Sequence, residues 1–353
     1  MSFAQFIQES WNRQAKWLVL LRPLSWLYGA GAKLNQTLYK TGLKTVYTAP
    51  IPVMVVGNIT VGGSGKTPLL IQLVKYLASK DVKVGVISRG YGGEGPFPAL
   101  VTQDSLTEQV GDEPCLIVRS TGVPMAVGAN RQACIELLLS QYTLDCIISD
   151  DGLQHLALDR QIEWIVLDLN RGLGNERLLP EGFLREPKSR LASGTVIEHC
   201  NTPSSALNMH LKTGDVYLLN TSQLQHTSQS QIADTEYSSS VFFDRTMPFY
   251  AVVGIGFPQR FYQTLESLGV HDFQCHEFKD HHDYDITDLQ FEDHYPIITT
   301  EKDAVKIAEL LKQYPDFDRE IWVVPVEAVL SEKCYSVLDQ QFTELGIVLH
   351  DLK

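Results

Sequence analysis

The sequence has few cysteines, few basic residues and no long apolar run. Its six cysteines stand apart and form no Cys-x-x-Cys pair, which argues against a zinc ribbon or a disulfide framework and favours a reducing compartment. Lysine and arginine number 29 against 42 aspartates and glutamates, so a general nucleic-acid-binding protein is not expected. The strongest apolar stretch, residues 17–21, is far shorter than the ~20 residues that cross a bilayer.

The chain contains enough apolar material for two folded units. Hydrophobic residues make up 44% and charged residues 20% of its 353 residues, a composition typical of globular proteins. After residue 46, short β-branched runs alternate with helical spacing, which predicts an α/β fold with a parallel sheet flanked by helices. The expected strands lie at 52–57, 82–88, 124–128, 146–149 and 162–169, and the expected helices at 66–79 and 131–140.

These patterns divide the chain into four expected parts. An N-terminal helical arm covers residues 1–45, and the core with the parallel sheet covers 46–200. A connecting segment rich in Ser, Thr and Gln follows at 201–245, with only 216–219 strand-like. A smaller C-terminal α/β lobe is expected over 246–353, with strands at 249–254, 296–300 and 321–325 and helices at 258–268 and 331–345.

The arm is basic and rich in tryptophan. It carries six basic residues and one acidic residue, together with three of the five tryptophans of the chain, Trp11, Trp17 and Trp26. An amphipathic helix of this composition can lie in a lipid interface, with its aromatic residues inward and its lysines toward anionic headgroups. The alternative is a helical arm that packs only on its own protein, and the arm's sequence leaves both open.

A phosphate-binding loop follows the first expected strand. We call the phosphate cradle the segment Gly62, Gly63, Ser64, Gly65, Lys66 and Thr67. Glycines between a strand and a helix let backbone N–H groups surround phosphate oxygens; the lysine would reach the β- and γ-phosphates of ATP, and the threonine hydroxyl would bind Mg²⁺. Thr60 stands where the usual pattern has glycine. A chance glycine-rich turn is the alternative, but the flanking strand and helix favour a P-loop NTPase core.

Further charged residues follow expected strands or open expected helices. Asp150 and Asp151 end an apolar strand, where P-loop proteins complete a magnesium shell, although a turn or helix cap would also explain them. Asp112 with Glu113, and His281 with His282, are candidates for a carboxylate–histidine proton acceptor, and solvated loops are the alternative. The remaining candidates, which could line a site for a transferring phosphoryl group, are Arg131, Arg185 and Glu186.

Taken together, these segments resemble the tetraacyldisaccharide 4′-kinase family, which phosphorylates the lipid A precursor. The matching segments occur in the family's order and extend from the arm to about residue 306. They are Val56–Pro68, Ser88-Arg89-Gly90-Tyr91-Gly92, Gly111-Asp112-Glu113-Pro114, Asp150–His155, Leu184-Arg185-Glu186-Pro187, Asp280-His281 and Thr299–Asp303. Thr60 agrees with the family pattern.

The resemblance implies a kinase that transfers the ATP γ-phosphate to the 4′-hydroxyl of an acylated glucosamine disaccharide 1-phosphate. It implies that Asp112 is the general base, paired with His281 when the two lobes close. It further implies that Asp150 and Asp151 serve Mg²⁺ and the transferring phosphate, and that Glu113, Arg131, Arg185 and Glu186 line the active site. The expected location is the inner leaflet of a Gram-negative inner membrane, on its cytoplasmic face, where the arm would bind peripherally.

Two rival interpretations fit the cradle alone. A P-loop switch GTPase or metallochaperone would carry a guanine-reading Asn-Lys-x-Asp or a Cys-x-x-Cys handoff site, and the sequence has neither. A soluble small-molecule kinase would leave the basic, tryptophan-rich arm without a role.

Overall fold

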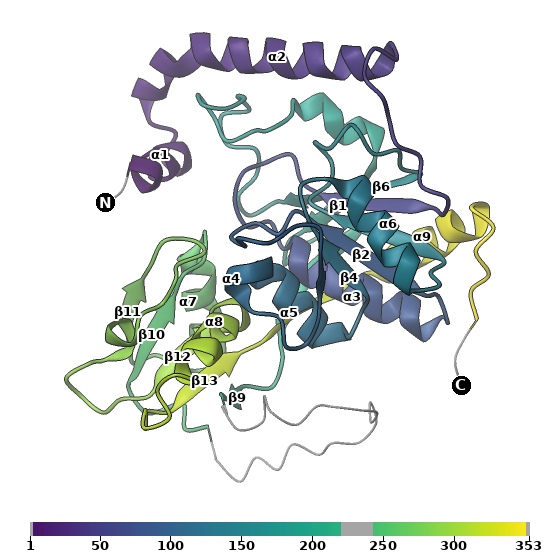
Figure 1. Cartoon of the computed structure of the whole chain (residues 1–353). Helices are drawn as coiled ribbons and strands as arrows, with labels where there is room; N and C mark the ends of the chain where they lie inside the picture. The colour runs from purple at the N-terminus through teal and green to yellow at the C-terminus, as the bar shows by residue number, and fades with distance from the viewer. Residues whose placement is uncertain (1–2, 220–242, 351–353) are drawn as a thin grey trace.

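Nine strands form the large sheet of the computed structural model, which describes residues 3–219 and 243–350 (Figure 1). From edge to edge they are β14 (Val326–Leu330), β8 (Asn208–Thr213), β7 (Thr195–His199), β6 (Ile162–Asp168), β1 (Val53–Gly57), β5 (Cys146–Asp150), β2 (Val84–Ser88), β4 (Met125–Val127) and β3 (Ala99–Val101). The strands from β8 to β4 pair in parallel, whereas the edge strands β14 and β3 pair antiparallel. The predicted α/β class with a mostly parallel sheet is confirmed.

Helices cover both faces of this sheet because alternate strand residues point to opposite sides. Met54 and Val56 of β1 share a core with α3 (Lys66–Ser79), α5 (Asp112–Thr121) and α9 (Glu332–Glu344). Val53 belongs instead to a second core with α6 (Arg131–Gln141) on the opposite face. Two short segments, α4 (Thr107–Val110) and the 3₁₀ helix η2 (Lys188–Ser193), lie in the connections.

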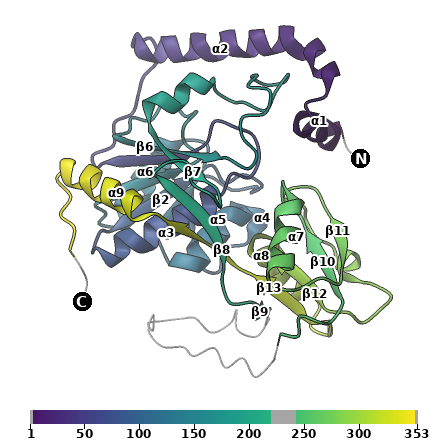
Figure 2. The same ribbon diagram turned by 180° about the vertical axis from the view of Figure 1, so that it is seen from behind.

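A second lobe is built on a smaller sheet beside the first (Figure 2). Its strand order is β11 (Phe273–Glu277), β10 (Phe249–Val253), β12 (Ile297–Thr300), β13 (Ile321–Val324) and β9 (Tyr217–Leu218). Phe249, Ala251 and Val253 pack with α7 (Pro258–Ser267), while Tyr250 and Val252 pack with α8 (Glu301–Leu311) on the other face. The 3₁₀ helix η4 (Ile286–Leu289) completes this lobe.

The lobe boundaries differ from the expected ones at both ends of the second lobe. The expected connecting segment contains β8, which joins the large sheet, and β9, which joins the small one; its residues 220–242 lie outside the described part of the chain. At the other end, β14 pairs antiparallel with β8, and α9 returns with it to the large lobe. The apolar face of α9 supplies the reason, because Cys334, Leu338 and Phe342 are buried in the large lobe's core.

The arm consists of α1 (Phe3–Asn12), the 3₁₀ helix η1 (Lys16–Leu21) and α2 (Arg22–Lys40), which lies along the outside of the large lobe (Figure 1). Ser25 donates to the backbone oxygen of Leu178 at 2.9 Å, and the guanidinium of Arg22 pairs with Glu181 at 2.8 Å. These contacts attach one face of α2 to the loop that contains Leu178 and Glu181. None of the described helices is long and apolar enough to cross a membrane.

Candidate active site

The phosphate cradle joins β1 to α3, as the sequence predicts. Gly65 caps α3 with a φ of 89°, a left-handed conformation that suits glycine. The Lys66 ammonium lies 3.2 Å from the side-chain oxygen of Asn58, and the Asn58 amide donates to Ser64 Oγ at 3.0 Å. Asn58 therefore holds the lysine and the loop in place, with the lysine at the start of the helix where phosphate would bind.

Asp150 ends β5, which lies beside β1 in the sheet, and Asp151 follows it, so both carboxylates lie at the end of the strand next to the cradle strand. Asp151 lies 2.7 and 2.8 Å from the guanidinium of Arg185 and 3.4 Å from Lys66 Nζ. Burial alone would raise the pKa of Asp151, but the hydrogen bonds and charges of Arg185 and Lys66 outweigh it and hold that pKa well below its ordinary value. The Asp151 carboxylate is therefore ionised and fully engaged.

Asp150 is in a different situation. Its carboxyl group is buried, and burial, followed by the charges of Glu113 and Asp151, raises its pKa above the ordinary value. Ser88 donates to its Oδ2 at 3.2 Å, but its buried Oδ1 has no hydrogen-bond partner within the described residues. A buried carboxylate oxygen without a partner is costly unless a cation or donor completes it.

Of the four residues expected to line the site, Glu113 accepts from the Lys302 ammonium of the second lobe at 3.2 Å, and the other three take different positions. Arg185 faces Asp151, as described above, and also donates to the backbone oxygen of Asn58 at 2.9 Å. Glu186 accepts from Gln154 at 2.6 Å and pairs with Arg190 at 3.2 Å, so it supports the Asp150–His155 loop. Arg131 is buried at the start of α6, where it donates to the Gly128 oxygen at 2.7 Å.

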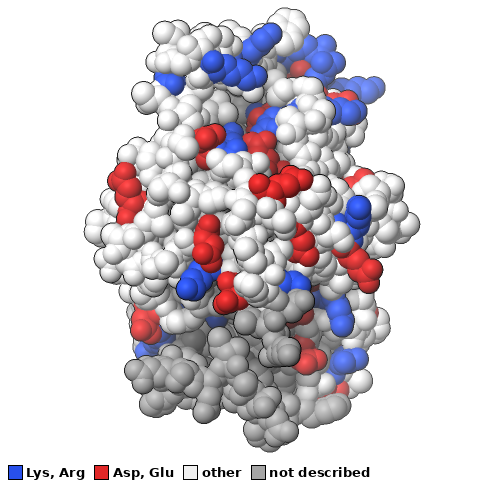
Figure 3. All heavy atoms as spheres, turned by 90° about the vertical axis from the view of Figure 1, so that its right-hand side faces the viewer, with Lys and Arg blue, Asp and Glu red and all other residues white. Residues whose placement is uncertain are grey.

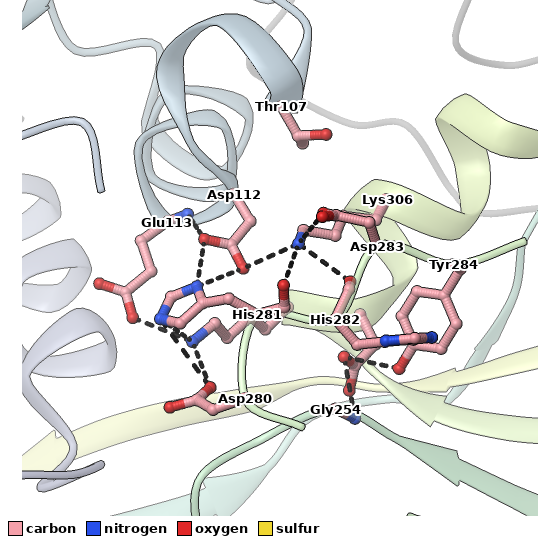
Figure 4. A network of polar contacts seen from close by, with 12 residues as sticks. Thr107, Asp112, Glu113, Gly254, Asp280, His281, His282, Asp283, Tyr284 and Lys306 are labelled. Carbon is pink, nitrogen blue, oxygen red and sulfur yellow. Dashed lines mark hydrogen bonds and ion pairs between the residues drawn. The ribbon is translucent and has the colours of Figure 1, made fainter. Parts of the chain in front are cut away.

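Asp112 and His281 meet across the two lobes, although 169 residues separate them in the sequence (Figure 4). His281 Nδ1 lies 2.9 Å from each oxygen of the Asp112 carboxylate. Asp112 is the first residue of α5, and a side chain at Gly111 (φ 98°) would lie 2.5 Å from the Tyr91 carbonyl oxygen, so the tight turn there needs glycine. His282 points elsewhere and contacts Asp288 at 2.9 Å.

The contact shifts the pKa of both partners toward the charged forms. Burial would raise the pKa of Asp112, but the hydrogen bond from His281 and the charges of Lys302, His281 and Lys306 lower it overall. Burial would lower the pKa of His281, but Asp112 raises it overall. Because Asp112 is 3% exposed and His281 is 20% exposed, solvent reaches the pair through the imidazole.

The second lobe also contacts the cradle region directly. Arg260 of α7 forms an ion pair with Asp168 at the end of β6. A side chain placed at Gly256 would come within 3.8 Å of the Gly63 amide nitrogen. The cradle, the two carboxylates of β5 and the Asp112–His281 pair therefore gather where the two lobes meet, at the carboxyl ends of the parallel strands, which is where open α/β sheets bind ligands.

Comparisons with known proteins identify the family of this chain. A model of the tetraacyldisaccharide-1-P 4′-kinase family matches residues 17–343. The chain belongs to this family. It is 48% identical to a tetraacyldisaccharide 4′-kinase from Psychrobacter cryohalolentis over 98% of both chains, and 44% identical to one from Actinobacillus pleuropneumoniae serotype 5b over 93% of this chain and 96% of the relative. The resemblance found in the sequence is confirmed.

A solved structure of the same family has the same fold. A crystal structure of LpxK from Aquifex aeolicus in complex with ATP is 25% identical to this chain and superposes with a TM-score of 0.71. The match covers 93% of this chain and 99% of that one.

Several residues of the site have no role in the sequence analysis. Asn58 and Lys302 lie inside the segments that resemble the family, but their residue types carry no catalytic signal by themselves. Arg171, whose guanidinium donates to the Val61 oxygen of the cradle loop, lies outside those segments. Only the folded chain brings these side chains to the site.

Proposed function

We propose that this chain transfers the γ-phosphate of ATP to the 4′-hydroxyl of a tetraacyl glucosamine disaccharide 1-phosphate, a step of lipid A biosynthesis. The observation that carries the proposal is the meeting of a phosphate cradle with a buried carboxylate–imidazole pair in a member of this kinase family. A cradle alone binds nucleotide, whereas an adjacent proton acceptor is what transfer to an alcohol needs.

The transfer requires a proton acceptor and charge stabilisation. The acceptor 4′-hydroxyl gives its proton to the Asp112–His281 pair as its oxygen bonds to the γ-phosphorus, and the bond from that phosphorus to the β–γ bridging oxygen breaks to leave ADP. Lys66 and Arg185 both pair with Asp151 Oδ1 and can stabilise the charge on the phosphoryl oxygens. Asp151 orients both cations.

Mg²⁺ fits the residues at the end of β5. Asp150 Oδ1 is the buried carboxylate oxygen without a partner among the described residues, and Thr67 stands in the first turn of α3. Asp151 is engaged by Arg185, so Asp150 and the Thr67 hydroxyl are the preferred protein ligands. When bound, Mg²⁺ would neutralise charge on the β- and γ-phosphates.

The arm would bring the enzyme to its lipid substrate at the cytoplasmic face of the inner membrane. An acylated substrate leaves a bilayer only at about 0.8 kcal/mol for each CH₂ exposed to water, so the enzyme must approach the membrane. Trp26 is 67% exposed on α2, and Lys and Arg side chains gather at the end of the molecule where this helix lies (Figure 3). Trp11 donates to the Pro180 oxygen at 3.0 Å and Trp17 stacks on Phe6, so of the three predicted membrane-contacting tryptophans only Trp26 is exposed.

Phosphate transfer from labelled ATP to purified tetraacyl disaccharide 1-phosphate tests the proposal. The wild-type protein should give a 4′-phosphorylated lipid, and Lys66→Ala should not. Lipid-independent GTP hydrolysis without a lipid product would favour a switch GTPase or metallochaperone. Phosphorylation of a water-soluble alcohol in preference to the lipid would favour a small-molecule kinase.

A further inference from the structure

Lys302, the second residue of α8, reaches from the second lobe into the Asp112–His281 pair. Its ammonium lies 3.3 Å from His281 Nε2, 3.1 Å from Asp280 Oδ1 and 3.2 Å from Glu113 Oε1. Only 19% of this side chain is exposed. The ammonium therefore bridges the two lobes at the ring nitrogen that faces away from Asp112.

This contact selects the tautomer of His281. A lysine ammonium has three N–H donors and no lone pair, so it can only donate. His281 Nε2 must then accept, which leaves Nδ1 to carry the proton and donate it to Asp112 at 2.9 Å. In this arrangement the carboxylate orients the ring, and the Nε2 lone pair accepts from Lys302 in the unliganded site.

The same contact opposes protonation of the ring. A positive charge 3.3 Å from Nε2 disfavours the imidazolium form, and the two carboxylates on Lys302 keep that lysine charged. Burial would lower the pKa of Lys302, but the charges of Glu113, Asp280 and Asp112 raise it overall. The titratable groups around the His281 ring come from four segments. They are Asp112 and Glu113 of α5, Lys302 and Lys306 of α8, Asp280, which precedes His281 in the chain, and Tyr91 of the loop after β2.

We propose that Lys302 is a positioning residue for the phosphoryl transfer, which holds His281 in the tautomer with an unprotonated Nε2 and opposes conversion of the ring to the imidazolium. Without it, the three surrounding carboxylates and the phenol ring would favour the imidazolium, which cannot receive the acceptor proton. The inference rests on the proposed function for its kinetic consequence, but its effect on His281 is a property of the protein alone.

A substitution at Glu309 can distinguish this role of Lys302 from a contact that only holds the two lobes together. It lies on the same helix, accepts from the Thr107 amide and hydroxyl at 2.9 and 2.7 Å, and pairs with Arg119 at 2.6 Å. It thus joins the lobes without contacting the Asp112–His281 pair. Glu309→Gln is the matched control for a loss of interlobe contact.

The first experiment follows the titration of His281 by NMR in the unliganded full-length protein, with its signal assigned by its absence in His281→Gln. Lys302→Met should move the midpoint up by about one pH unit, because an adjacent cation is lost and its two carboxylates are left unpaired. Asp280→Asn should move it down, because a carboxylate that favours the imidazolium is lost. Lys302→Arg and Glu309→Gln should stay within about 0.3 pH unit of the wild type.

The second experiment measures kcat against pH in the same variants. The kcat of Lys302→Met should be about tenfold or more below that of the wild type at pH 6.5, and part of this loss should be recovered at pH 8. Lys302→Arg should keep the acid limb of the wild-type kcat profile. The proposal is overturned if the His281 midpoint is the same in Lys302→Met and the wild type, or if Glu309→Gln moves it equally. If Lys302→Met does not fold, the proposal is overturned when the midpoint of the His281 titration in Asp280→Asn equals or exceeds that of the wild type. A shifted midpoint in a protein with no lipid kinase activity would reject the proposed function alone.

Discussion

The exposed face of α2 makes a quantitative prediction about membrane binding. Leu24, Leu27 and Leu34 recur at intervals of three and seven residues and form one apolar stripe, with exposed fractions of 52, 70 and 61%. The opposite face carries Ser25, which is buried against the large lobe. The stripe is therefore free to enter a lipid interface while α2 stays attached to the protein.

Leu27→Glu should weaken binding to anionic vesicles roughly 30- to 150-fold. Burying a whole leucine side chain contributes about 1.5–3 kcal/mol, so the 70% of Leu27 that is exposed can contribute about 1–2 kcal/mol. A new negative charge beside anionic headgroups costs about 1 kcal/mol more. The sum of about 2–3 kcal/mol gives the expected change in the partition coefficient.

Co-sedimentation with vesicles of mixed anionic and zwitterionic lipid measures this change. Gln36→Glu is the matched control, since it adds the same charge at an exposed position of α2 that lies off the stripe. Added salt should weaken wild-type binding without abolishing it, because the apolar part is not screened. Equal binding by the Leu27 and Gln36 variants, or wild-type binding after removal of residues 1–45, would refute membrane attachment through this stripe.

Three further predictions concern the active site. Lys66→Ala should lower kcat by about 10²–10³ in an unchanged fold, and near wild-type turnover would remove this lysine from the mechanism. Asp112→Ala and His281→Ala should each lower kcat by about 10²–10⁴, and the double variant should be little worse than the poorer single; strictly additive losses would separate the two roles. Burial would lower the pKa of His281, but Asp112 raises it overall. The free energy that this raised pKa contributes to stability is fully present below the pKa of ~6.5 in the unfolded chain, and it is lost as pH rises through the pKa in the folded protein. Urea unfolding should therefore show a larger loss of stability for His281→Ala at pH 6 than at pH 9, and an equal loss would contradict the assignment.

Patterns within short segments predict much of the core. The strand, the cradle and α3 are contiguous in the chain, so β-branched residues, glycines and a helical repeat suffice to predict β1, the loop and the helix. Asp150 and Asp151 follow the same logic, because the carboxyl end of a buried parallel strand is at the ligand-binding edge. The family resemblance added the partnership of Asp112 with His281, which neither residue indicates alone.

Tertiary structure decided what depends on packing between distant segments. The sequence by itself determined the core elements, the cradle and the basic arm. Only the fold placed α9 in the large lobe, engaged Asp151 with Arg185 and left Asp150 Oδ1 without a partner among the described residues. Only the fold brought Lys302 to the imidazole of His281. The physical reason is that strand and helix periodicities arise from neighbouring residues, whereas a buried polar contact exists only after two lobes with their own cores have packed together.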